Sequence, residues 1–256
     1  MSLSVIPIKS RKKQSSFDLF KEIVNSLQNS SVTLENSDIL VISSKYISTS
    51  QQRLLDIDKI KPSKDVSYLS DKFQLNPNVA EIIVRESDVI FGGIPGFVIA
   101  SSDNILAPNA GIDKSNAKKG KLILYPDEPY NIAEQLKRKF FLNFQINIGV
   151  IIVDSRLMPS RIGTTGVAIA CSGIEPIKDM RAQNDLEGNP LKVTFQAVAD
   201  TVASIANQQM GEGSESKPFA IVKNSGAKLT NRKITENEMT VSHDICVYVR
   251  GLKNNE

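Results

Sequence analysis

The sequence predicts an α+β protein in which helices flank mixed β-sheets. Short apolar runs of strand length recur along the chain, and apolar residues at helical spacing fill several of the intervals between them. With 256 residues and 41% hydrophobic content, the chain can bury a full core as one large domain or two small ones. No apolar run of the sequence approaches the ~20 residues of a membrane span, so we expect a cytoplasmic protein without a membrane partner.

The N-terminal part reads as a strand, a helix and a second strand. Residues 3–8 and 39–43 are apolar runs of strand length. Between them, apolar side chains recur at helical spacing, at Phe17, Phe20, Ile23, Val24 and Leu27. Residues 50–75 are polar and mixed, and Asn76-Pro77 then predicts a short helix that begins at the proline.

The middle of the chain alternates short strands with glycine-rich or polar turns. We expect strands at 89–91, 97–100, 105–107 and 122–125, a loop at 109–116 and a basic helix at 131–141. The apolar run 148–153 ends at Asp154. Since open α/β sheets place ligand contacts at the carboxyl ends of their strands, Asp154 is a candidate ligand-binding residue.

The remaining part predicts strands at 165–171, 219–222 and 245–249, and a long helix at 194–209 with a narrow face of small apolar residues. This helix ends in Met210-Gly211-Glu212-Gly213, where glycine permits a left-handed helix stop. Residues 223–243 are polar and show no clear periodicity. We therefore expect a main domain over residues 1–225, with room for two intertwined subdomains, and a C-terminal extension over 226–256.

Several function classes lack their sequence signatures. A P-loop requires Gly-Lys-Ser or Gly-Lys-Thr, but Gly120-Lys121 is followed by Leu122. The stretch 211–216 lacks the third glycine of a dinucleotide-binding motif and follows a helix rather than a strand. A net charge of +3 and 6% aromatic content do not favour a nucleic-acid partner.

The two cysteines and the single histidine offer little chemistry. Cys171 and Cys246 lie in apolar, strand-like surroundings without metal-ligand spacing, so we expect two small core residues. His243 has neither a second histidine nor a serine nucleophile motif to act with, and we expect it to have no chemical role.

Three acidic residues beside glycine-rich backbone, Asp113, Asp154 and Glu212, form a candidate metal and nucleotide site. Carboxylates are hard oxygen ligands for Mg²⁺ or Mn²⁺, and exposed backbone N–H groups bind phosphate. Structural alternatives remain open, since Asp113 can make an Asx turn and Asp154 can cap the following segment. Glu212 is hardest to explain structurally, because its flanking glycines already make the turn. A structural protein with accidental acids is disfavoured, because clustered carboxylates are costly without a cation.

The order of these motifs resembles the coenzyme F-420-0:L-glutamate ligase (F-420 gamma-glutamyl ligase) family over residues 3–223. The resemblance rests on Asn109-Ala-Gly-Ile-Asp113-x-x-Asn116, Asp154-Ser155, Thr165-Gly-Val-Ala-Ile169, Asp185-Leu-x-Gly188, Ala199-Asp200 and Met210-Gly-Glu-Gly213. The family joins L-glutamate to the lactyl carboxylate of a deazaflavin coenzyme precursor, driven by GTP and a divalent metal. The resemblance therefore implies a gamma-glutamyl ligase-like fold, neither P-loop nor Rossmann, in a homodimer.

The resemblance also implies roles for individual residues. Asp113 and Asp154 would bind Mg²⁺ or Mn²⁺, with Ser155 and Glu212 near a second ion. The nucleotide would contact Ser43, Ser44, Asn116, Met210, Gly211 and Gly213. Beyond the metal site no side chain is needed as an acid or base, because the substrate carboxylate attacks the γ-phosphate and glutamate's amine opens the resulting acyl phosphate.

Departures from the family pattern leave two functions open. The family reads Ser-Lys-x-Glu-Gly-Arg where this chain has Ser48-Thr49-Ser-Gln51-Gln52-Arg53, and Asp-Thr-x-Gly-Arg where it has Asp154-Ser-Arg-Leu157-Met158. The changes at Thr49, Gln51, Leu157 and Met158 alter or remove polar contacts, which Arg156 or Arg161 can replace from nearby. The chain is then either such a ligase, a divergent paralogue included, or a non-catalytic homologue that binds a nucleotide or deazaflavin as a sensor or scaffold.

Overall fold

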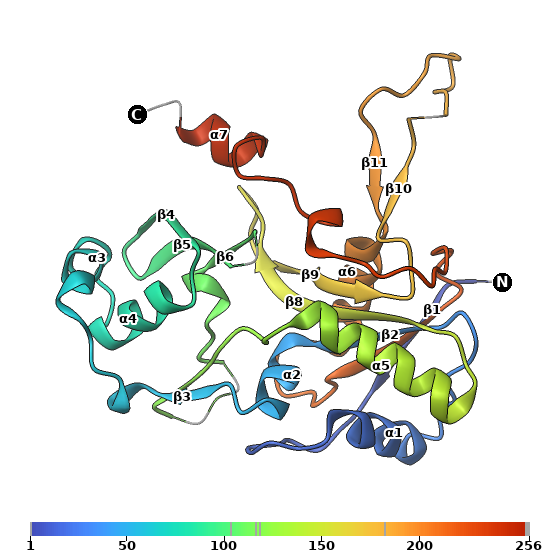
Figure 1. Cartoon of the computed structure of the whole chain (residues 1–256), viewed down its shortest axis with the longest axis horizontal. Helices are drawn as coiled ribbons and strands as arrows, with labels where there is room; N and C mark the ends of the chain where they lie inside the picture. Colours follow the sequence, from blue (N-terminus) through green and yellow to red (C-terminus); the bar gives the residue numbers. More distant parts are fainter. Residues whose placement is uncertain (1, 103, 116, 118, 182, 254–256) are drawn as a thin grey trace. The chain divides into compact units, whose positions relative to one another are not determined.

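The computed structural model describes residues 2–102, 104–115, 117, 119–181 and 183–253 and confirms the α+β fold class (Figure 1). The chain divides into two compact units. Unit 1 contains Met1–Lys13, Phe17–Tyr46 and Glu128–Met239, and unit 2 contains Gln14–Ser16, Ile47–Asp127 and Thr240–Glu256. The predicted domain limit at residue 225 stays a prediction. Within the described ranges, no helix is both long and apolar enough to cross a membrane.

Unit 1 is built on a five-stranded sheet with the strand order β1-β12-β2-β8-β9. Its strands are β1 (Ser4–Ile8), β12 (Phe219–Lys223), β2 (Ile39–Ser43), β8 (Gly149–Leu157) and β9 (Thr164–Ser172), and each confirms a strand or apolar run predicted from the sequence. β2 and β8 pair in parallel, whereas the other neighbours are antiparallel. The carboxyl ends of β2 and β8 therefore point to the same edge of the sheet.

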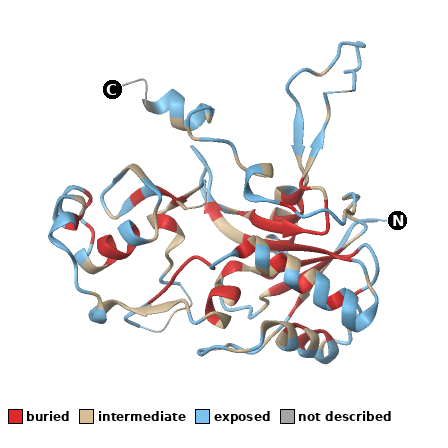
Figure 2. Cartoon of the chain, in the orientation of Figure 1, coloured by how far each residue is buried: buried red, intermediate tan, exposed pale blue. Residues whose placement is uncertain are grey.

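One face of this sheet packs against α6 (Val198–Met210). The helix presents small apolar side chains, among them Val202 and Ala206, to Ile151 and Val153 of β8. Figure 2 shows how the buried residues concentrate in the strands of unit 1. The narrow face predicted from the sequence is therefore the face by which α6 packs on the sheet.

The other face is covered by α5 (Pro129–Phe144). Ser172 lies opposite Val150 in the ladder of β8 and β9, and its hydroxyl donates a hydrogen bond to Glu134 of α5. Because neighbouring strand residues point to opposite faces, the even-numbered residues of β8 lie on the α5 face. An aromatic contact joins α5 to α1 (Leu19–Asn29), which confirms the helix predicted between the first two strands.

Unit 2 has two small sheets, short helices and an apolar core of its own. Its strands are β3 (Leu54–Asp56), paired with β7 (Lys121–Ile123), and β4 (Val89–Ile94), β5 (Phe97–Ser102) and β6 (Ile105–Pro108) in an antiparallel sheet. Its helices are α3 (Ser67–Phe73), α4 (Pro77–Arg85) and α7 (Val247–Lys253), and α2 (Ser44–Ser50) runs from unit 1 into unit 2. Short 3-10 helices lie at Ile57–Lys59, Lys64–Val66 and Asn109–Gly111, and in unit 1 at Glu236–Glu238.

The predicted helix at 194–209 begins later than expected. Its first residues form β11 (Phe195–Ala197), which pairs with β10 (Ile177–Asp179) in an antiparallel hairpin of unit 1. α6 starts directly after this strand, at Val198. Apolar periodicity alone did not reveal the change, because the helical spacing already begins at Ala197, the last residue of β11.

The C-terminal part of the structure differs more strongly from the prediction. The predicted strand at 245–249 is wrong, because α7 takes up Val247 and the residues after it. Five residues are too few for periodicity to separate a strand from a helix. Cys246 is accordingly half-buried rather than the core residue that we expected, whereas Cys171 is buried as predicted. His243 lies within unit 2, with Nε2 2.9 Å from Ser101 Oγ.

Asn76 caps the N-terminus of α4. Its side-chain oxygen accepts hydrogen bonds from the N–H groups of Asn78 at 2.9 Å and Val79 at 3.4 Å. Replacing Asn76 by alanine should lower the free energy of unfolding by about 1 kcal/mol, because these donors lose their partner. Urea denaturation measures the change. Asn76→Asp keeps the acceptor and should stay close to the wild type, and an equal loss in both variants would contradict the capping role.

Candidate functional site

The carboxyl edge of β2 and β8 brings a serine and an aspartate into contact. Ser43 pairs with Val153 in the parallel ladder, so Ser44 and Asp154 follow at neighbouring positions. The Ser44 hydroxyl donates to Asp154 Oδ1 at 2.5 Å. The Asp154 side chain is 12% exposed. Unit 1 thus holds a nearly buried carboxylate at the sheet edge where the sequence predicted a ligand contact, although β8 itself continues to Leu157.

Arg156 forms an ion pair with this aspartate. Its Nε lies 3.0 Å from Asp154 Oδ2, and the arginine side chain is 5% exposed. Residues two positions apart on a strand share a face, so the sheet itself aligns the two groups. We expected Arg156 or Arg161 to replace a phosphate-binding arginine. The structure places Arg156 on Asp154 and leaves Arg161 exposed in the turn between β8 and β9.

Ser155 and Glu212 form a second polar group on the α6 face of β8. The Ser155 hydroxyl donates to Glu212 Oε1 at 2.6 Å, and Asn207 Nδ2 donates to the same oxygen at 2.7 Å. Gly166 lies opposite Ser155 in the ladder, and a Cβ atom on this glycine would stand 2.5 Å from Asn207 Cβ. Ser155 therefore faces α6, whereas Asp154 leaves β8 on the opposite face.

The glycine turn after α6 lies against the carboxylate of Glu215. The Gly213 N–H donates to Glu215 Oε2 at 2.8 Å. Gly211 has φ +83°, and a Cβ atom there would stand 2.5 Å from Glu215 Cδ. Backbone N–H groups that accommodate a carboxylate can accommodate a phosphate oxygen in its place. Met210 is buried in the core of unit 1, so its side chain serves packing.

Sequence reasoning missed Asn207 and Glu215. The available signal was position, because Asn207 stands one helical turn before the glycine turn and Glu215 comes two residues after Gly213. In the Ala199-Asp200 motif, the aspartate stabilises the fold, because Asp200 Oδ1 accepts a hydrogen bond from the Ala168 N–H at 2.9 Å. Burial raises the pKa of Asp200 above its ordinary value, and this hydrogen bond opposes the rise.

Asp113 lies in unit 2 and makes an Asx turn. Its Oδ1 accepts a hydrogen bond from the Ser115 N–H at 2.6 Å, and its Oδ2 accepts one from the Ser115 hydroxyl at 2.7 Å. Its backbone exchanges hydrogen bonds with Ile123. The structural alternative for Asp113 is therefore present, and its role as a metal ligand stays a prediction. Asn116 lies outside the described residues.

The changed positions of the family pattern lie in different surroundings. Gln51 Nε2 donates to the Asp127 carbonyl at 2.9 Å, and Gln51 Oε1 accepts from the Asp127 N–H at 3.0 Å. Thr49 is buried. Leu157 and Met158 are exposed at the end of β8. Gln51 therefore ties two segments of unit 2 together, and its side chain carries no charge that could meet a phosphate.

The donor set of unit 1 suits a hard divalent cation. Asp154 and Glu212 supply carboxylates, and Ser44 and Ser155 supply hydroxyl groups, which are the ligand types that Mg²⁺ and Mn²⁺ prefer. Among the described residues, no three side chains of histidine, cysteine, aspartate or glutamate gather into a ready-made cage. An ion would therefore depend on water or substrate phosphate for part of its shell, as is usual for Mg²⁺.

A family model and three similar proteins bear names of the same activity. The sequence model of the F420-0:Gamma-glutamyl ligase family matches residues 7–224. A coenzyme F420:L-glutamate ligase of Methanopyrus kandleri is 34% identical over 222 residues, which cover 86% of each chain. The protein of that name from Methanocaldococcus jannaschii is 36% identical over 201 residues, 78% of this chain and 80% of the relative. The protein of that name from Archaeoglobus fulgidus is 30% identical over 223 residues, which cover 87% of this chain and 88% of the relative.

Proposed function

Because the chain belongs to the F420-0:gamma-glutamyl ligase family, we propose that it joins L-glutamate to a carboxylate of a deazaflavin coenzyme F-420 precursor, using GTP and a divalent metal. The structural observation that carries the proposal is the contact between Ser44 and Asp154 at the carboxyl edge of β2 and β8. Ser155 and Glu212 add a second pair of oxygen donors from the same strand and the turn after α6.

In this proposal Asp154 and Ser44 hold one Mg²⁺ or Mn²⁺ ion, and Glu212 and Ser155 hold a second. When bound, the ions neutralise charge on the triphosphate. Arg156 holds the Asp154 carboxylate in a fixed orientation, because its Nε lies 3.0 Å from Asp154 Oδ2 in a nearly buried position. Asn207 does the same for Glu212 by fixing one carboxylate oxygen through its amide.

The glycine turn binds the phosphate chain in this proposal. Gly213 offers its backbone N–H group once the Glu215 carboxylate gives way to a phosphate. The Gly211 N–H donates to the Asn207 carbonyl oxygen, so Gly211 contributes the close, side-chain-free approach of the turn, where a Cβ atom would meet Glu215. Ser43, Ser44, Met210 and Asn116 are the other proposed nucleotide contacts. For Met210 the buried side chain restricts the contact to its backbone.

The reaction then needs little from protein side chains beyond positioning. The precursor carboxylate attacks the γ-phosphate in line, which forms an acyl phosphate and releases GDP. The amine of L-glutamate attacks the acyl carbon, phosphate leaves, and the amine proton passes to water. We propose that this occurs in a cytoplasmic homodimer. Exposed apolar side chains on the β10–β11 hairpin, which a second copy can cover, support the dimer.

Nucleotide binding provides the first experiment. Calorimetry with GTP and with ATP, each with Mg²⁺ or Mn²⁺ and again with a chelator, should show binding that requires the metal. Preference for GTP would support the proposed co-substrate. The absence of binding in every condition would contradict the proposal, because an intact set of oxygen donors would then serve no nucleotide.

Asp113→Asn separates the metal role of this residue from its turn. Asparagine retains one side-chain oxygen for the Ser115 N–H but loses the negative charge. If Asp113 binds metal, the variant should lose metal-dependent GTP binding and keep its melting temperature, as calorimetry and thermal denaturation would show. Unchanged binding with a lower melting temperature would assign Asp113 to the Asx turn alone.

A non-catalytic sensor or scaffold remains the second candidate function. The observation that favours it is Gln51, whose amide engages Asp127 where the family pattern has a glutamate. A scaffold should bind GTP or a deazaflavin without forming GDP when glutamate is added. A ligase should form GDP continuously only when both the precursor and glutamate are present, because without glutamate the reaction stops at the acyl phosphate.

A further inference from the structure

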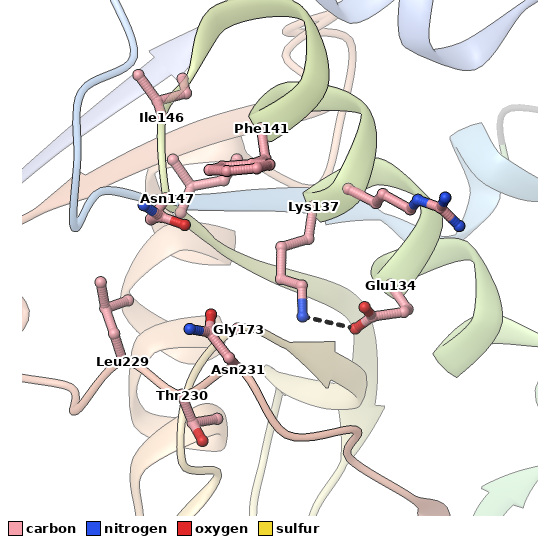
Figure 3. A pocket seen from close by; sticks show the side chains of 11 residues that line it. Glu134, Lys137, Phe141, Ile146, Asn147, Gly173, Leu229, Thr230 and Asn231 are labelled. Carbon is pink, nitrogen blue, oxygen red and sulfur yellow. Dashed lines mark ion pairs between the residues drawn. The ribbon is translucent and has the colours of Figure 1, made fainter.

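Unit 1 contains a hollow of about 270 Å³ at the amino end of β8 (Figure 3). It is lined by α5, by the segment 146–148 that leads into β8, by Gly173 and by residues 229–231. Asp154 lies on the same strand, and its distance from Ile148 is ~20 Å at about 3.3 Å per residue. The hollow is therefore separate from the proposed metal and nucleotide site.

Lys137 of α5 places its ammonium group at this hollow. Its side chain is only 15% exposed, and Nζ lies 2.8 Å from Glu134 Oε2. Figure 3 shows the two side chains pointing toward each other. The lysine stem passes close to Gly173, where a Cβ atom would stand 3.1 Å from Lys137 Cδ and 2.3 Å from the Ile148 carbonyl oxygen. Glycine at position 173 thus leaves the space in which Lys137 lies.

Glu134 is held as a carboxylate. The Ser172 hydroxyl donates at 2.5 Å to the same oxygen that meets Lys137. Burial alone would raise the pKa of Glu134, but the hydrogen bonds from Lys137 and Ser172 outweigh burial and lower it. An ammonium group carries three donors, so Lys137 can bind a second anion while it keeps Glu134.

The other walls combine apolar surface with polar groups. Apolar side chains come from Phe141, Ile146, Ile148 and Leu229, and amide or hydroxyl groups from Asn147, Thr230 and Asn231. Arg138, an exposed residue, also lines the hollow, so the lining residues carry two positive charges and one negative charge, that of Glu134. The volume of about 270 Å³ lies just below the usual range for drug-sized ligands, which favours a small metabolite.

We propose that this hollow binds a small amphipathic anion, whose carboxylate or phosphate meets Lys137 and whose compact apolar body lies against Phe141 and Leu229. The charge excess selects an anion, and the apolar wall excludes fully hydrated ions. This site is independent of the ligase reaction, since no residue of the proposed metal site lines it.

Calorimetry with three probes tests the proposal on the full chain without nucleotide. 4-Methylpentanoate and isobutyl phosphate carry the two possible anionic groups on a branched apolar body, and 4-methylpentanamide is the neutral counterpart. At least one anion should bind ~10-fold more tightly than the amide, because a charge-assisted hydrogen bond is lost in the amide. Equal affinity for the amide and the anions would overturn the proposal.

Two variants on α5 test the role of the ion pair. Lys137→Met keeps the apolar stem and should weaken anion binding ~10-fold or more. Glu134→Gln keeps an acceptor for Ser172 and frees Lys137, so it should tighten anion binding. Lys139→Met removes a positive charge from the same helix outside the hollow and should leave binding unchanged.

The remaining outcomes decide against the site. Absence of anion binding in both the wild type and Glu134→Gln would overturn it, whether or not Lys137→Met folds. Equal weakening in Lys139→Met and Lys137→Met would mean that general charge, not the hollow, attracts the anion. Asp154→Asn should bind the probes as the wild type does, so a failure of the proposed ligase function leaves this test intact.

Discussion

Asp154→Asn is expected to lower the rate of metal-dependent glutamate ligation by about 100-fold or more. Asparagine keeps the size of aspartate and can still accept the hydrogen bond from Ser44. It loses the charge that a divalent ion requires of its ligand. The same variant should lose metal-dependent GTP binding, measured by calorimetry at fixed metal concentration.

A second change separates this loss of activity from a loss of stability. The buried guanidinium of Arg156 loses a carboxylate partner in Asp154→Asn, and breaking a buried ion pair from one side costs about 3–5 kcal/mol of folding free energy. The double variant Asp154→Asn with Arg156→Met removes both charges and should recover much of that stability. Its activity should stay as low as that of the single variant, because the ligand charge is still absent.

Asp179→Asn is the matched control for this pair. Asp179 and Arg181 are two residues apart, as Asp154 and Arg156 are, and a guanidinium nitrogen of Arg181 lies 2.7 Å from Asp179 Oδ2. Unlike the first pair, both side chains are about half exposed, Asp179 at 48% and Arg181 at 50%. Exposed ion pairs contribute little, so stability and ligation should both stay near the wild type. Full metal-dependent activity in Asp154→Asn would remove Asp154 from the site, whatever its effect on stability.

Gly166→Ala should lower the free energy of unfolding by about 1–3 kcal/mol and weaken nucleotide binding as well. The added Cβ would stand 2.5 Å from Asn207 Cβ and 2.7 Å from the Ala203 carbonyl oxygen, so α6 must move away from β9. That movement shifts Asn207, and with it the hydrogen bond to Glu212. Urea denaturation and GTP calorimetry measure the two effects.

Gly251→Ala provides the comparison. A Cβ atom at Gly251 meets nothing within 4 Å, and the residue lies within α7, where alanine is the better helix former. This variant should keep or slightly raise the stability of the chain. If Gly166→Ala proved as stable as Gly251→Ala, the close approach of α6 to β9 would not be what places Asn207 beside Glu212.

Much of the fold could be predicted because the buried strands are nearly continuous apolar runs. β2 and β12 were predicted within one residue at their ends, because each is an unbroken apolar run up to its last residue, Ser43 in β2 and Lys223 in β12. The segment 245–249 is also apolar in part, but no strand of the described ranges pairs with it, and it forms a turn and the start of α7. A strand requires a partner, and a partner is not visible in a local pattern.

The candidate site was predictable in its residues but not in its pairings. The run before Asp154 indicated a strand end, whereas the contact with Ser44 depends on the parallel pairing of β2 and β8, which joins segments about a hundred residues apart. The separation of Asp154 from Ser155 could have been predicted, because neighbours on a strand face opposite sides. The burial of Arg156 could not, since charged residues are rarely buried.

The most direct test of the proposed function is mass spectrometry of the ligation reaction itself. The full chain is incubated with the F-420-0 precursor, L-glutamate, GTP and Mn²⁺ or Mg²⁺, and the precursor is examined for the addition of glutamyl residues. The proposal predicts at least one added glutamate, one GDP for each amide formed, and no product with chelator. Metal-dependent GTP binding without any glutamylated product would contradict it and would identify the chain as a nucleotide-binding homologue without ligase activity.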